Sequence, residues 1–72
     1  MIQTLAGTAG VVVAALPNAM FRVRLDDGVR ITAYAAGKIK LSKAKVLVGD
    51  RVLVRRGREE SKLGGIVYRY KP

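Results

Sequence analysis

The sequence predicts a small all-β domain, a barrel of five short strands with one short helix. The chain has 72 residues, enough for one domain and too few for a second. Half of its residues are hydrophobic, so it can build a core. Apolar and polar residues alternate in several short stretches separated by Gly, Pro, Asn and Asp, which is typical of half-buried strands joined by turns.

The N-terminal part predicts a lead-in and then the first strand. Residues 1–9 are mostly small and polar, and we expect them to form a loose lead-in. Gly10–Ala15 is rich in valine, which favours strands, so the first strand is expected there.

A hairpin is the clearest local pattern in the chain. Pro17 and Asn18 favour a turn, because Pro presets its φ angle and the Asn side chain bonds nearby backbone. In residues 21–25, Phe, Val and Leu alternate with two arginines, which places the arginines on the wet face of a strand. An Asp-Asp-Gly turn at 26–28 then predicts that a strand over Val29–Tyr34 pairs back on the first.

The second half predicts a helix and two more strands. The lysine-rich middle of the chain alternates like a strand, but its Ala, Leu and Lys residues also tolerate a helix, and we favour a short helix over residues 38–43. A Gly-Asp turn at 49–50 leads into a fourth strand over Arg51–Arg56. After a charged loop and two glycines, Ile66–Tyr70 predicts the fifth strand.

These elements fit the OB-fold, a five-stranded barrel that often binds oligonucleotides. The short helix is then placed between the third and fourth strands. An SH3-like barrel fits the chain length nearly as well. We expect residues 1–72 to form a single OB-fold RNA-binding domain and the chain to be a monomer.

Catalysis and cofactor binding are poorly supported by the residue types present. The chain has no cysteine and no histidine, so disulfides, thiolate ligands and the commonest metal ligand are missing. The paired carboxylates at 26–27 and 59–60 are sequence neighbours within predicted turns, where neighbouring side chains tend to point apart. No glycine pattern forms a phosphate-binding fingerprint. We therefore expect neither an enzyme nor a cofactor.

We also expect no membrane association. The apolar run Val11–Leu16 is far shorter than the roughly 20 residues that span a bilayer. Residues 1–10 lack the lysine or arginine that begins a signal peptide. The predicted location is the cytoplasm, with an organellar stroma or matrix as the alternative.

The charge predicts a polyanionic partner. Fourteen Lys and Arg oppose five Asp and Glu, for a net charge of +9, and nucleic acid is the commonest polyanion that relieves such repulsion. An anionic membrane is less well supported, because no long basic amphipathic helix is visible. The basic residues of the second half form two groups: Lys38, Lys40, Lys43 and Lys45 before the Gly-Asp turn, and Arg51, Arg55, Arg56 and Arg58 after it.

Four aromatic residues are candidates for stacking on bases. Phe21 shares its strand face with apolar residues and is expected in the core. Tyr34 lies on the polar side of its strand and is the better candidate. Tyr68 and Tyr70 lie two and four residues after Ile66, so all three are expected on one face of the strand. At least Tyr68 therefore fits the core as well as it fits a stacking role. Four rings suit docking onto a structured RNA by shape and phosphate contact better than reading a long single strand.

Several motifs resemble bacterial-type translation initiation factor 1. The segment Leu-Pro-Asn-Ala-Met-Phe-Arg-Val at 16–23 is the most specific, and the spacing matches without an insertion from Gly10 to Arg69. The weaker matches are Gly10-Val11-Val12, Asp27-Gly28, Gly37-Lys38, Gly49-Asp50-Arg51-Val52 and Gly64-Gly65-Ile66-Val67-Tyr68-Arg69.

The resemblance implies an OB-fold that binds the decoding region of the small ribosomal subunit, at the aminoacyl-tRNA site. It implies contacts to ribosomal RNA and a neighbouring ribosomal protein, cooperation with the other two initiation factors, and no enzymatic activity. Some members of that family also act as RNA chaperones or antiterminators. The alternatives are a general RNA-binding or RNA-chaperone module without ribosome specificity, and a structural ribosomal protein.

The family's basic positions carry over to this chain as Arg22, Lys38, Lys40, Lys45, where the family usually has Arg, and Arg69. The chain departs from the family at four features: Tyr34 replaces a usual His, Gly65 a usual Arg, Arg-Glu-Glu at 58–60 a usual Pro-Tyr-Asp, and residues 1–8 a usual acidic N-terminal tail. Together with the residues singled out by charge and exposure, the candidate RNA-binding residues are Arg22, Tyr34, Lys38, Lys40, Lys43, Lys45, Arg51 and Arg69.

Overall fold

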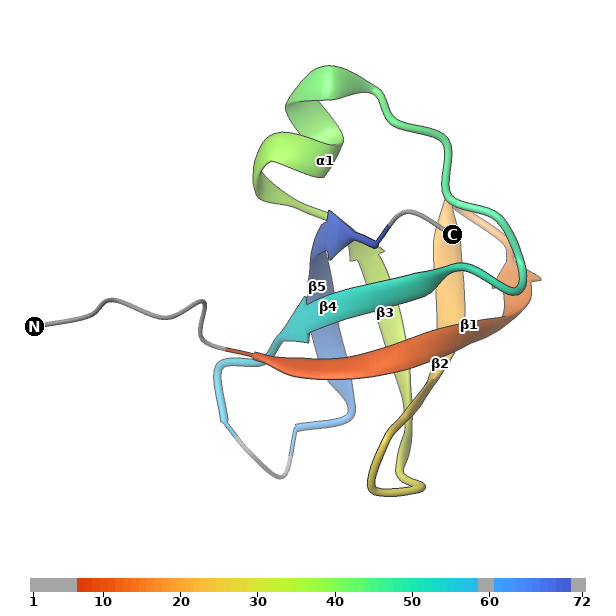
Figure 1. Ribbon diagram of the computed structural model, residues 1–72, viewed down its shortest axis with the longest axis vertical. Helices are drawn as coiled ribbons and strands as arrows, with labels where there is room; N and C mark the ends of the chain where they lie inside the picture. The colour runs from red at the N-terminus through yellow and green to blue at the C-terminus, as the bar shows by residue number, and fades with distance from the viewer. Residues whose placement is uncertain (1–6, 59–60, 71–72) are drawn as a thin grey trace, which may run out of the picture.

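The computed structural model describes residues 7–58 and 61–70, which form a closed five-stranded barrel with one short helix (Figure 1). Around the barrel the strand order is β1-β2-β3-β5-β4; β3 and β5 pair in parallel and the other neighbours are antiparallel. This arrangement, with the helix between the third and fourth strands, is an OB-fold, as predicted. The elements in chain order are β1 (Thr8–Leu16), β2 (Met20–Leu25), β3 (Arg30–Ala35), α1 (Gly37–Ser42), β4 (Arg51–Arg55) and β5 (Leu63–Arg69).

The predicted element positions are close to the observed ones, with one clear difference at the N-terminus. Thr8 and Ala9 were expected in the loose lead-in, but they begin β1 and pair with Val54 and Leu53 of β4. They belong to the barrel because β1 has to reach β4 to close it. Residues 1–6 of the expected lead-in lie outside the described residues.

Alternation along β2 and β3 builds the centre of the core. Val23 and Ile31 face each other across the two strands and are almost fully buried, while Arg22 and Arg24 point outward and are exposed. Phe21, expected in the core, is partly buried and packs against it. The buried core cluster consists of Val12, Val23, Leu25, Ile31, Ala33, Ile39, Val46, Val52, Val54 and Ile66.

A bulge in β5 changes which residues face the core. Val54 pairs with Ile66 and the preceding Leu53 pairs with Tyr68, so Val67 is an extra residue in β5. An extra residue reverses the alternation beyond it. Tyr68 is therefore 45% exposed although Ile66 is fully buried, and the expectation that the two share one face is wrong.

Two glycines allow strands to approach closely. A Cβ atom on Gly10 of β1 would lie 2.6 Å from the carbonyl oxygen of Arg24 in β2. A Cβ atom on Gly64 of β5 would lie 2.6 Å from a methyl carbon of Val54 in β4. At both positions only glycine fits the barrel without displacing a neighbouring strand.

The described part of the chain contains no helix that is long and apolar enough to cross a membrane. α1 is a six-residue helix that extends from one end of the barrel, away from the β2–β3 turn (Figure 1).

Candidate nucleic-acid interface

α1 is held in place by burial rather than by its own stability. It has no side-chain N-cap at Ala36 and no acidic residue in its first turn, and a helix of this length is unstable alone. Ile39 is 8% exposed and joins the core, as does Val46 in the segment that returns to β4. Lys43 ends the helix in a left-handed conformation, with its backbone N–H directed to the last carbonyls.

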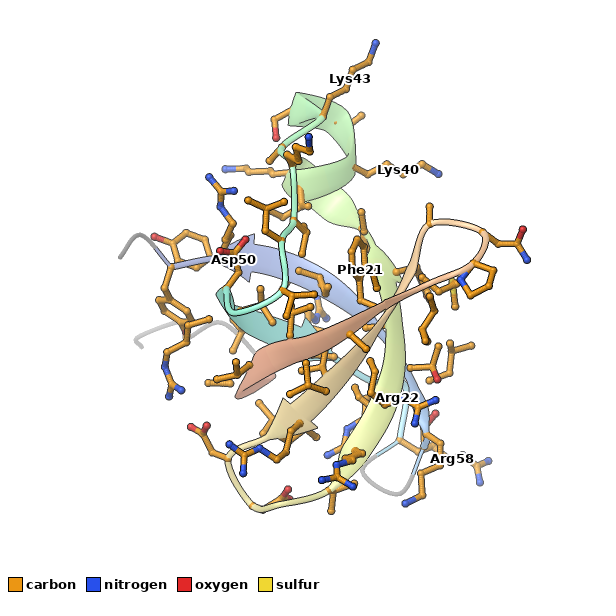
Figure 2. All side chains as sticks on the ribbon, turned by 90° about the vertical axis from the view of Figure 1, so that its right-hand side faces the viewer. Phe21, Arg22, Lys40, Lys43, Asp50 and Arg58 are labelled. Carbon is orange, nitrogen blue, oxygen red and sulfur yellow. The ribbon has the colours of Figure 1, made fainter. Side chains whose placement is uncertain are left out.

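The four lysines of this region, Lys38, Lys40, Lys43 and Lys45, are called the lysine segment below. All four are exposed, whereas Ile39, between Lys38 and Lys40, and Val46, directly after Lys45, are buried. Figure 2 shows Lys40 and Lys43 projecting from the helix away from the barrel. Among residues 7–58 and 61–70, ion pairs with carboxylates involve only Arg51 and Arg69, so the lysine segment keeps its charge available for an anion.

Arg51, one of the candidate RNA-binding residues, is engaged with a carboxylate. Its Nη1 and Nη2 atoms donate hydrogen bonds to the Oδ1 and Oδ2 atoms of Asp26, at 3.2 and 2.8 Å. The hydrogen bond and the negative charge of Asp26 raise the pKa of the Arg51 guanidinium. The pair joins β4 to the end of β2 and neutralises both charges on the surface.

Arg69, another candidate, is also engaged within the protein. Its Nη1 atom donates a hydrogen bond to the carbonyl oxygen of Lys45 and lies 3.7 Å from Oδ2 of Asp50. Asp50 in turn accepts a hydrogen bond from the backbone N–H of Leu47 at 2.8 Å. Arg69 thus fastens the segment that carries Lys45 to the end of β5.

Arg22 and Tyr34 lie on the outer surface of β2 and β3. Arg22 is exposed and Tyr34 is 42% exposed. Tyr34 pairs with Met20 on one side and with Gly65 on the other. A Cβ atom on Gly65 would lie 3.5 Å from the ring of Tyr34, so the ring rests over a glycine that has no side chain. The glycine therefore leaves space beside the ring.

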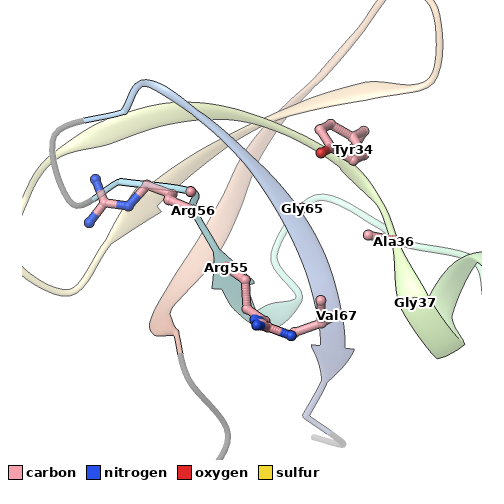
Figure 3. Close-up of a pocket in the computed structure, with 8 residues that line it drawn as sticks. Tyr34, Ala36, Gly37, Arg55, Arg56, Gly65 and Val67 are labelled. Atoms are coloured by element: carbon pink, nitrogen blue, oxygen red, sulfur yellow. The ribbon is translucent and has the colours of Figure 1, made fainter.

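That space is part of an open groove between β3, α1 and the β4–β5 region. One hollow of about 350 Å³ is lined by Tyr34, Gly65 and the residues around them, and a second of about 410 Å³ extends to Lys38 and Tyr68. Figure 3 shows Tyr34 on one side of β5 and Arg55 on the other, with the Arg55 side chain beside Val67. The residues that line both hollows are Gly37, Arg55 and Val67.

The groove brings together residues that the sequence did not single out. Arg55 and Arg56 were noted as basic residues but were not among the candidates, because the β4–β5 pairing that places them near Tyr34 is not visible in the sequence. Arg56 donates a hydrogen bond to the carbonyl oxygen of Ser61 at 3.2 Å and points away from the ring, whereas Arg55 lines both hollows (Figure 3). The sequence signal that could have revealed the groove is the glycine pair at 64–65, because adjacent glycines indicate that neighbouring strands approach each other closely.

The structure therefore separates the eight candidates into four groups. The lysine segment forms one exposed basic surface. Tyr34 lines the first hollow of the groove, whereas Lys38 lines the second. Arg22 lies apart from α1, toward the other end of the barrel (Figure 2). Arg51 and Arg69 form contacts within the protein. Glu59 and Glu60 lie outside the described residues.

A small OB-fold barrel with an exposed basic surface is typical of nucleic-acid-binding proteins. Comparison with known proteins gives its family. The chain matches the family model of translation initiation factor 1A / IF-1 over residues 4–72. The chain belongs to this family, which confirms the resemblance to bacterial-type initiation factor 1.

The similar proteins carry the same family name. The chain is 48% identical over 60 residues to proteins named chloroplastic translation initiation factor IF-1 from Oryza sativa subsp. indica and from Sorghum bicolor. Those residues are 83% of this chain and 56% of each relative, so the chain spans little more than half the length of these relatives.

Solved structures share the barrel. The solution structure of translation initiation factor 1 from the Wolbachia endosymbiont strain TRS of Brugia malayi is 40% identical, with a TM-score of 0.74, and the match covers 92% of this chain and 78% of that one. The crystal structure of YjeQ from Thermotoga maritima matches with a TM-score of 0.72 and 30% identity, over 92% of this chain and 23% of that one. The same barrel thus also occurs within a much longer chain.

Proposed function

We propose that this protein is an initiation factor that binds the decoding region of the small ribosomal subunit, at the aminoacyl-tRNA site. The observation that carries the proposal is the lysine segment, four exposed cations without a carboxylate partner among the described residues, on a barrel of the initiation factor 1A / IF-1 family. Ribosomal RNA supplies the phosphates that such a surface needs.

The lysine segment contributes phosphate contacts in this proposal. Lysine is a compact point charge that suits contact with phosphate oxygens and carries no base preference. Because the burial of Ile39 and Val46 fixes the segment to the barrel, the four charges are presented without first ordering a free loop. Arg69 supports this arrangement by holding the backbone at Lys45.

The groove contributes a base contact. An unstacked base can lie against the exposed ring of Tyr34 over Gly65, while Arg55 and Lys38 at the groove hold its phosphates. Stacking of a base on an aromatic ring is worth about 1–3 kcal/mol. This contact is largely independent of salt, unlike the phosphate contacts.

The partners in this proposal are the RNA of the small subunit, a neighbouring ribosomal protein and the other two initiation factors. The protein acts as a monomer and catalyses no reaction. It works in the cytoplasm or, in view of the relatives named chloroplastic, in an organellar compartment.

A binding competition tests the proposal against a general RNA-binding module. Labelled protein is bound to purified small subunits, and either unlabelled subunits or an equal mass of unstructured RNA is added at physiological salt. The proposal expects subunits to displace the label at far lower concentration than bulk RNA. Equal displacement by the two would assign the protein to general RNA binding, which its net charge of +9 also supports.

A further inference from the structure

We infer that Asp50 is a positioning residue for RNA binding: its carboxylate holds the backbone beside Lys45, so this acidic side chain raises the affinity of the protein for RNA. The inference rests on the proposed RNA-binding function and adds to it a residue that acts on RNA through Lys45. The effect is opposite to the one that the charge of Asp50 predicts.

The carboxylate of Asp50 connects the backbone after α1 to β5. Its Oδ2 atom accepts a hydrogen bond from the backbone N–H of Leu47 at 2.8 Å and lies 3.7 Å from Nη1 of Arg69. The same Nη1 atom donates a hydrogen bond to the carbonyl oxygen of Lys45. One carboxylate oxygen therefore holds the backbone at Leu47 and also the guanidinium that holds the backbone at Lys45.

The backbone around Lys45 has little other support. It lies between α1 and β4, in neither a helix nor a strand. Among the described residues, no backbone–backbone hydrogen bond involves Lys45 or Val46. The Val46 side chain packs into the core, whereas the next residue, Leu47, is half-exposed. Two anchors thus fix this stretch: the Val46 side chain and the contacts of Arg69 and Asp50.

Asp50 itself is fixed to the barrel through its own backbone. Its carbonyl oxygen accepts a hydrogen bond from the N–H of Val12 in β1 at 3.0 Å, and the N–H of Gly49 donates to the carbonyl oxygen of Val12 at 2.8 Å. Figure 2 shows Asp50 where the segment that descends from α1 reaches the barrel. Because this carboxylate is already anchored, it loses little freedom in holding a neighbouring backbone.

Charge by itself predicts that Asp50 weakens RNA binding. A carboxylate within a Debye length of a phosphate, about 8 Å at physiological salt, repels that phosphate. The two other carboxylate side chains among the described residues, Asp26 and Asp27, lie at the β2–β3 turn, away from α1 (Figure 1). Removing Asp50 would raise the net charge from +9 to +10 and would strengthen RNA binding if charge decided the outcome.

Positioning of Lys45 opposes this repulsion. A loose stretch has to be ordered when RNA binds, and the loss of freedom reduces affinity. A lysine that is not held toward the RNA also loses its phosphate contact. The negative charge of Asp50 is offset by the guanidinium of Arg69, so its repulsion of phosphate is reduced. We therefore expect the positioning effect to exceed the repulsion.

Fluorescence anisotropy with the full chain tests the inference. The probe is a labelled fragment of small-subunit RNA, titrated between about 50 and 200 mM salt. Asp50→Ala removes the charge and the acceptor, whereas Asp50→Asn removes the charge and keeps an acceptor oxygen for Leu47. Asp27→Ala is the matched control, because Oδ1 of Asp27 also accepts one backbone hydrogen bond, from Val29 at 3.0 Å, but far from Lys45. Urea unfolding of each variant is measured in parallel.

The inference expects Asp50→Ala to weaken RNA binding about three- to tenfold and to lower the slope of log affinity against log salt by about 0.7–0.9, the value of one phosphate contact. Asp50→Asn should bind with an affinity between those of the parent and Asp50→Ala, because it keeps the bond to Leu47. Asp27→Ala should bind as tightly as the parent or slightly more tightly, since it removes a negative charge without moving Lys45.

A double-mutant cycle separates positioning from a general loss of folding. In a Lys45→Gln background, Asp50→Ala should no longer weaken binding, because the contact that Asp50 positions is already gone. An equal loss in both backgrounds would overturn the inference and make Asp50 a support of the barrel as a whole. Unchanged or tighter binding by Asp50→Ala would also overturn it. If Asp50→Ala does not fold, Asp50→Asn takes its place in the cycle, with the same two outcomes.

Failure of the inference and failure of the ribosomal proposal are distinguishable. If the parent protein gave no protection of the decoding region while Asp50→Ala still weakened RNA binding through Lys45, the ribosomal proposal would fail and the role of Asp50 would stand. If the parent protected the decoding region and the Asp50 variants bound RNA as tightly as the parent, the role of Asp50 would fail and the ribosomal proposal would stand.

Discussion

Neutralising the lysine segment should make RNA binding less sensitive to salt. Each exposed lysine that contacts a phosphate displaces condensed counterions, and its loss lowers the slope of log affinity against log salt by about 0.7–0.9. Between about 50 and 200 mM salt, one such contact accounts for roughly a threefold change in affinity. Changing Lys38, Lys40 and Lys45 to Gln together should therefore lower the slope by about 2 to 3.

Arg51→Gln is the matched control within the same chain. It also removes one positive charge, but that charge is already paired with Asp26 through two hydrogen bonds. Its slope should therefore change by much less than that of a single lysine variant. The assay is anisotropy of a labelled fragment of small-subunit RNA across a salt series. Equal slope changes for Arg51→Gln and a lysine variant would refute this assignment, as would an unchanged slope in the triple variant.

Three other predictions concern the barrel and its titration. Gly10→Ala should lower the unfolding free energy by about 1–3 kcal/mol in urea, because its Cβ meets backbone atoms of β2, whereas Gly57→Ala, with no atom within 4 Å, should be nearly neutral. Ala19→Gly should raise the thermal midpoint slightly, because Ala19 has a φ of 58°, a left-handed conformation that glycine adopts with less strain than alanine. A lowered midpoint would show that Ala19 is not strained. RNA affinity at fixed ionic strength should change less than about twofold between pH 6 and pH 8, because the chain has no His or Cys.

The Arg51–Asp26 pair adds no pH dependence to folding stability near neutral pH. A raised pKa means that the folded state holds the proton more tightly, so the associated stability is present below the ordinary pKa of arginine and is lost only as the pH rises through the still higher folded value. That range lies far above neutrality. Urea midpoints at neutral and mildly alkaline pH should therefore not differ on account of the Arg51–Asp26 pair.

The β2–β3 hairpin was predictable because its pattern is local. Strict alternation from residue 21 to 25 fixes which side chains are buried, and the Asp-Gly turn fixes the register. The short helix was predicted within one residue, at 38–43 against Gly37–Ser42. A helix forms here instead of the alternative strand because Ile39 packs into the core at one end of the barrel.

β5 shows what local patterns do not contain. Its pairing with β3 is parallel and begins at Leu63, and this long-range contact needs Gly64 and Gly65 rather than strand-forming residues. The bulge at Val67 then turns Tyr68 outward. Strict alternation from Ile66 predicted instead that Tyr68 would face the same way as Ile66. Both features arise from closure of the barrel.

The same distinction applies to the candidate site. Exposure of the lysine segment followed from its high density of charge, whereas the pairing of Arg51 with Asp26 joins residues 25 positions apart in the chain. The groove depends on three elements meeting at Gly65. Sequence patterns thus predicted which residues are charged and exposed, but not which of those charges are already satisfied within the protein.

Chemical footprinting of small-subunit RNA shows directly whether the lysine segment binds the decoding region. The parent protein, the triple Lys→Gln variant and Arg51→Gln are each bound to purified subunits at low salt. We expect protection of the decoding region by the parent and by Arg51→Gln, and strongly reduced protection by the lysine variant. Absence of protection in the decoding region by the parent protein would contradict the claim.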